Sequence, residues 1–95
     1  RSYINNLTLY LKYLLLIKEV MTLDKHTIQG LTAFTTRTLP SNEFEKRMLN
    51  AGYFQVGSAP GQGKRIKVWW SHDDYPRVES IYSPDKNIVL TAYHV

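Results

Sequence analysis

The hydrophobic pattern of this 95-residue chain changes at Gly52, and the change strongly limits which folds are possible. Before Gly52, apolar residues recur about every third or fourth position, as in helices. After Gly52, apolar and polar residues alternate, as in strands. The alternation is clearest in KRIKVWWS (residues 64–71), where Ile66, Val68 and Trp70 share one face and Arg65, Lys67 and Trp69 the other. Helices followed by strands indicate an α+β fold.

Three segments before Gly52 have helical features. Residues 3–20 carry apolar side chains with a period of 3.6, so we expect an amphipathic helix there. A short second element is expected to begin near Lys25 and to end in a loop by Thr35, because Gly30 and the later threonines weaken a helix.

The third helical segment, LPSNEFEKRMLNAG, carries the clearest end signals. Ser41 or Asn42 is expected to cap its start, and Gly52 supplies a left-handed stop. Its predicted apolar face consists of Phe44, Met48 and Leu49.

After Gly52, turn sequences separate four apolar runs. PGQG, HDDYP and PDKN divide residues 53–59, 64–71, 77–83 and 88–95. We therefore expect one domain over residues 1–95, with a helical part of about 1–52 packed on an antiparallel meander of about four strands in 53–95.

Composition favours a phosphate-bearing partner and argues against membrane insertion. Twelve Lys and Arg face eight Asp and Glu, so Lys64, Arg65 and Lys67 can contact RNA phosphates while Trp69 and Trp70 stack on bases. The apolar run at 9–20 is interrupted by charges and is shorter than the ~20 residues that span a bilayer. The absence of cysteine favours a reducing cytosol.

No metal or cofactor site is expected. The three histidines, His26, His72 and His94, form no pair at helical spacing, and HDD at 72–74 is explained by a charged turn. The glycine-rich GSAPGQGKR has no following helix to receive a phosphate.

Four residues suit RNA cleavage by its own 2′-hydroxyl: His26, Arg37, Thr91 and Tyr93. Histidine takes a proton near neutral pH, and arginine binds a phosphate through two hydrogen bonds. Thr91 and Tyr93 are two apart on one expected strand and point to the same side, whereas His94 points to the other. Each of the four residues also has an ordinary structural explanation. The distance between the His26 and Tyr93 side chains distinguishes the catalytic interpretation from the structural one.

The order of these residues resembles a known family. A His in KHTIQG, an Arg eleven residues later and Thr-x-Tyr in VLTAYHV are similar to the bacterial RNase A-like toxin domains of contact-dependent growth inhibition and related polymorphic toxins. They also resemble the wider group of EndoU, barnase-like and colicin-like metal-independent RNase toxins. The resemblance implies an RNase A-like or barnase/EndoU-like fold.

The resemblance also implies roles. His26 is then the general base, Arg37 binds the phosphate, and Thr91 and Tyr93 hydrogen-bond it or protonate the leaving oxygen. His94 is a reserve candidate for the acid if the last strand is bulged. The function implied is an antibacterial toxin endoribonuclease that cleaves RNA, with tRNA one candidate, and is neutralised by a cognate immunity protein. Such a domain is a secreted toxin tip delivered from the producing cell into the target cytoplasm, which agrees with a chain beginning at Arg1.

Two other functions remain open at this point. A non-catalytic RNA-binding module would use Trp69, Trp70, Tyr75 and the basic run 64–67, and would bind RNA in a salt-sensitive way without cleaving it. A protein-interaction domain would dock through the apolar first helix and would have no affinity for RNA.

Overall fold

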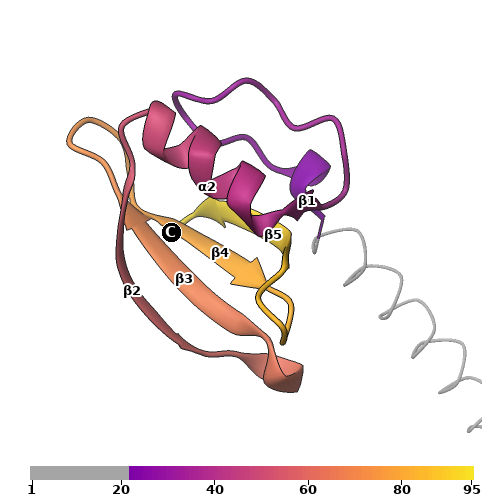
Figure 1. Cartoon of the computed structure of the whole chain (residues 1–95). Coiled ribbons are helices and arrows are strands. Elements are labelled where there is room, and N and C mark those ends of the chain that lie inside the picture. The colour runs from indigo at the N-terminus through magenta and orange to yellow at the C-terminus, as the bar shows by residue number, and fades with distance from the viewer. Residues whose placement is uncertain (1–21) are drawn as a thin grey trace, which may run out of the picture.

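The computed structural model describes residues 22–95, and the helix expected at 3–20 lies outside them. The fold is α+β, with one α-helix over an antiparallel five-stranded sheet in the described part (Figure 1). The sheet order is β1-β5-β4-β3-β2. In chain order the elements are η1 (Leu23–Lys25), β1 (Leu39–Pro40), α2 (Ser41–Asn50), β2 (Phe54–Pro60), η2 (Gln62–Lys64), β3 (Ile66–Ser71), β4 (Val78–Tyr82) and β5 (Ile88–His94).

The structure corrects two expectations about these elements. The sheet has a fifth strand, because the two residues of β1 pair with Ile88 and Val89 at the start of β5. The short helix expected from Lys25 is a single 3-10 turn followed by an irregular loop. Gly30 explains the loop, since its φ of +90° is non-helical and a Cβ there would lie 2.7 Å from the Tyr75 ring.

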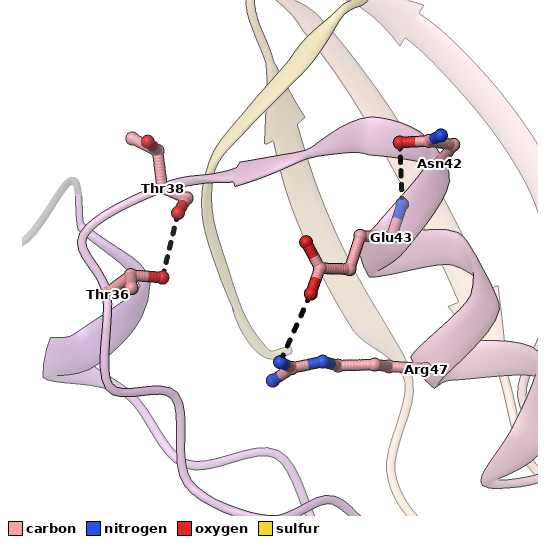
Figure 2. A network of polar contacts seen from close by, with 5 residues as sticks. All are labelled: Thr36, Thr38, Asn42, Glu43 and Arg47. Carbon is pink, nitrogen blue, oxygen red and sulfur yellow. Dashed lines mark hydrogen bonds and ion pairs between the residues drawn. The ribbon is translucent and has the colours of Figure 1, made fainter.

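The helix α2 begins and ends close to the expected positions. Ser41 does not cap it: its hydroxyl donates to the Lys86 carbonyl (2.7 Å) and so ties the start of α2 to the β4–β5 turn. Asn42 accepts a hydrogen bond from the Glu43 backbone, and Glu43 pairs with Arg47 one turn later (Figure 2). Gly52, with φ of +94°, ends the helical region as predicted.

The core lies between α2 and one face of the sheet. Phe44 and Met48 are fully buried, whereas Leu49, which we expected beside them, is exposed. The Phe44 ring forms T-shaped pairs with the rings of Trp70 and Tyr82, at centroid distances of 6.1 and 6.4 Å. Residues from the central strands complete this core face: Val68, Trp70, Val78, Ser80, Tyr82, Val89 and Ala92.

A β-bulge decides what the last strand presents on each face. Tyr82 pairs with Val89, but Ile81 pairs with Thr91, so Leu90 is an extra residue in β5. After the bulge, Ala92 lies on the core face, whereas Thr91 and Tyr93 share a face with Ile81 and Glu79. We call this side, opposite α2, the second face; it also carries Lys67 and Trp69.

Candidate active site on the second face of the sheet

Three residues form a row across the second face, one from each of three neighbouring strands. Trp69 of β3 pairs with Glu79 of β4, and Glu79 pairs with Tyr93 of β5. The Tyr93 hydroxyl donates to Glu79 Oε2 (2.5 Å), and the Trp69 indole N–H donates to Oε1 (2.9 Å). Both carboxylate oxygens therefore have a partner, and the three side chains are held in one geometry.

His26 extends this row beyond the sheet. Its ring centroid lies 5.5 Å from that of Tyr93, with the planes at 55°. His26 directly follows η1, which lies against β5; the backbone N–H of Leu23 donates to the Arg37 carbonyl (2.8 Å). The ring is partly exposed. Two residues that are 67 positions apart in the sequence are thus neighbours, as a shared site requires.

Charge on the second face is arranged around the single carboxylate of this row. Partial burial raises the pKa of Glu79, but hydrogen bonds from Tyr93 and Trp69 and the charges of Lys67 and Arg77 outweigh it, so the pKa lies below its ordinary value. Burial, the hydrogen bond to Glu79 and its negative charge together raise the pKa of Tyr93 to about 12. At neutral pH, therefore, Glu79 is ionised and Tyr93 keeps its proton.

Arg77 is a second cation at the row that the sequence did not single out. Its guanidinium carbon lies 5.3 Å from the centroid of the Trp69 ring, a cation–π arrangement. Arg77 and Lys67 place two positive charges around the single negative charge of Glu79. The net charge around the row is therefore positive, which favours the approach of a phosphate.

Thr91 and Arg37 do not join the row. Thr91 is 1% exposed, and its hydroxyl lies 3.5 Å from the Thr22 carbonyl, so it supports the segment before His26 rather than facing solvent. Arg37 is exposed, within a turn closed by the Thr36 hydroxyl donating to the Thr38 carbonyl (2.8 Å; Figure 2). The Arg37 carbonyl accepts the hydrogen bond from the Leu23 N–H of η1.

The expected RNA-binding residues separate into three places. Trp70 is 1% exposed in the core, where its indole N–H donates to Ser80, so its assignment as a base-stacking residue is corrected. Trp69 and Lys67 lie on the second face. Lys64 and Arg65 lie at the tip of the β2–β3 hairpin, where Lys64 has a φ of +65°.

The other two histidines have both ring nitrogens bonded to the backbone. His72 accepts from the Asp74 N–H at Nδ1 and donates from Nε2 to the Ala51 carbonyl (2.8 Å). His94 accepts from the Gln29 N–H at Nε2 (2.9 Å) and donates from Nδ1 to the Pro76 carbonyl (3.0 Å). The bulge lies before Thr91 and does not turn His94 to the second face, so His26 is the histidine of the row.

Comparisons with known proteins leave the family open. No protein-family model, characterised protein or solved structure matches this chain. Within residues 22–95, no group of three His, Cys, Asp or Glu side chains is placed to hold a metal ion. No helix in the same residues has the length and hydropathy to cross a bilayer.

Proposed function

We propose that this domain is a metal-independent endoribonuclease whose active site is the row Trp69–Glu79–Tyr93 together with His26. The single observation that carries the proposal is the 5.5 Å approach of the His26 and Tyr93 rings on the face that Lys67 and Arg77 make positive. An imidazole, a phenol and cations around one position are what 2′-hydroxyl attack on a phosphodiester requires.

In this mechanism His26 takes the proton of the 2′-hydroxyl as the 2′ oxygen attacks phosphorus. Lys67 and Arg77 balance the charge that grows on the phosphate oxygens. As the bond from phosphorus to the 5′ oxygen breaks, Tyr93 gives its proton to that oxygen. A phenol with a pKa of about 12 is still a stronger acid than the alcohol that leaves. The proton held by His26 then returns to Tyr93, and the product carries a 2′,3′-cyclic phosphate.

Glu79 gives Tyr93 a defined resting position in this scheme. In the resting state the Tyr93 hydroxyl donates to Glu79, and this hydrogen bond must break before Tyr93 can give its proton to the 5′ oxygen of the substrate. The carboxylate accepts from two donors and has a lowered pKa, which makes it a poor base for the 2′ proton. This is why we assign the base to His26.

The biological setting we propose follows the resemblance of the His, Arg and Thr-x-Tyr pattern to toxin domains. The domain would be the toxic tip of a secreted antibacterial protein, cleaving RNA in the target-cell cytoplasm. A cognate immunity protein would neutralise it by covering the second face, and Lys67 and Arg77 make an acidic partner surface suitable.

The test is incubation of the full chain with total RNA in EDTA, with cleavage ends analysed for cyclic phosphate. His26→Ala is expected to lower the rate about 10²–10⁴-fold, the usual contribution of a general base. Thr27→Ala, at the exposed neighbouring position, is the matched control and should cleave normally. Intact RNA with the folded wild type, or equal rates in wild type and His26→Ala, would rule the proposal out.

A non-catalytic RNA-binding module is the second candidate, favoured by one observation. Trp69 and Arg77 form a stacked pair beside Lys67, which is a suitable platform for a base and its phosphate. In that case Trp69→Ala should weaken RNA binding more than His26→Ala, and no cleavage should occur.

A further inference from the structure

His94 connects two backbone segments that lead into the candidate site. A carbonyl only accepts hydrogen bonds, so the contact with the Pro76 oxygen requires a proton on Nδ1. A backbone N–H only donates, so the contact from Gln29 requires Nε2 to be bare. The two contacts together fix a neutral ring in one tautomer.

The first connected segment carries His26. It passes the end of β5, so that His26 lies against Tyr93 and Gln29, three residues later, against His94. Since Tyr93 and His94 are consecutive in a strand, these contacts lie on opposite faces of the sheet. Buried Ile28 and a hydrogen bond from the Tyr53 hydroxyl to the Gln29 carbonyl (2.6 Å) anchor the same segment.

The second connected segment carries Arg77. Pro76, whose carbonyl accepts from His94, immediately precedes Arg77, whose guanidinium lies over Trp69. The Arg77 carbonyl in turn accepts from the Val95 N–H (2.9 Å). The His94 side chain, on the core-facing side of β5, therefore contacts two backbone segments. One leads to the His26 imidazole, and the other leads to the Arg77 guanidinium.

We propose that His94 is a positioning residue: its neutral ring ties the His26 segment to the Arg77 segment and keeps His26 against Tyr93. The catalytic consequence rests on the proposed ribonuclease function, whereas the tie itself does not. Loss of the His94 ring removes the acceptor for the Gln29 N–H, while buried Ile28 and the Tyr53 bond still hold part of the segment. Replacement of the His94 ring should therefore lower activity through loss of position.

Nuclear magnetic resonance of the full chain tests the tie without reference to RNA. Ring nitrogen shifts should show the Nδ1–H tautomer for His94. His94→Phe should speed exchange of the Gln29 amide about tenfold, the effect of losing one hydrogen bond of typical strength. His94→Gln, which can present an acceptor near the former Nε2, should restore part of the protection. Tyr53→Phe, the matched control, removes the partner of the Gln29 carbonyl and should affect this amide less.

Kinetics then separate positioning from direct acid catalysis. We expect His94→Phe to lower kcat with little change in KM and His94→Gln to recover much of it, because a glutamine can hold the segment but cannot act as an acid. Unchanged Gln29 exchange in His94→Phe, or an Nε2-protonated ring, overturns the proposal. The proposal is also overturned if His94→Phe and His94→Gln are equally inactive while the Gln29 amide exchanges at the wild-type rate. If the wild type cleaves no RNA, the ribonuclease proposal fails, while the exchange and tautomer results still decide the tie.

Discussion

Replacing Glu79 by glutamine tests the central contact of the candidate site, the hydrogen bond from Tyr93 to a carboxylate. Glutamine has nearly the same shape, leaves the burial of Tyr93 unchanged and can still accept a hydrogen bond. What it removes is the negative charge. The pKa of Tyr93 should therefore fall, because its phenolate would no longer face a carboxylate.

The size of the effect follows from the three causes that raise the pKa of Tyr93 from 10.0 to about 12. Burial is the largest and is retained in Glu79→Gln, whereas the strength of the hydrogen bond and the charge interaction are reduced. We expect the pKa of Tyr93 to fall by about one unit, which corresponds to about 1.4 kcal/mol. Since Tyr93 is partly exposed, screening by solvent reduces the stability difference to below ~1 kcal/mol.

The sign of the pH dependence is also fixed. Folded Tyr93 holds its proton more tightly than unfolded Tyr93, so this contribution to stability is complete below pH 10 and is lost as pH rises towards 12. Glu79 acts in the opposite range. Its pKa is lowered, so its contribution is present above about 4.5 and is lost as pH falls below that value. Glu79→Gln should reduce both losses.

The assay is an ultraviolet titration of the phenolates of the folded chain. The chain has seven tyrosines, so the Tyr93 signal is obtained by subtracting the curve of Tyr93→Phe. Urea unfolding at pH 7 and at alkaline pH measures how the free energy of unfolding changes with pH in wild type and Glu79→Gln. If the subtracted signal titrates at the same pH in wild type and Glu79→Gln, the carboxylate does not act on Tyr93, and the described row is not a coupled unit.

Three further outcomes follow from other contacts. Ser80→Ala should lower the free energy of unfolding by about 1–3 kcal/mol in urea melts, because the buried indole N–H of Trp70 loses its acceptor. Gly52→Ala should lower the melting temperature, since φ is +94° and the added Cβ would lie 2.8 Å from His72 Nε2; an unchanged melting curve would contradict that geometry. Lys67→Ala should reduce the salt dependence of RNA binding by about 0.7 in logarithmic slope if Lys67 contacts one phosphate of a single strand.

Much of the sheet could be predicted from the sequence because its signals are local. The alternation in residues 64–71 placed Val68 and Trp70 on one face of β3, and both residues are buried, although Trp70 was expected to stack on RNA bases. Gly52 was correctly expected to end α2 through a left-handed conformation. The two-residue strand β1 could not be predicted, since Leu39 and Pro40 carry no strand pattern and pair with β5 only through the tertiary fold.

The candidate site was only partly predictable. His26 and Tyr93 were selected for their chemistry and are neighbours in the structure. Glu79 and Arg77 were missed because their relevance depends on cross-strand register, which places Glu79 between Trp69 and Tyr93. The nearest sequence signal was the charge in RVESIYS, where Arg77 and Glu79 are two apart at the start of an apolar strand.

The bulge at Leu90 shows why residue spacing alone could not decide which face the site occupies. Strict alternation from buried Val89 would put Thr91 and Tyr93 in the core beneath α2. One extra residue reverses the faces of everything that follows: Ala92 fills the core, and the Tyr93 hydroxyl reaches Glu79. The same reversal turns His94 towards Gln29 and Pro76. The extra residue Leu90 thus places Tyr93 in the row beside Glu79, and it places His94 on the opposite face, where His94 contacts Gln29 and Pro76.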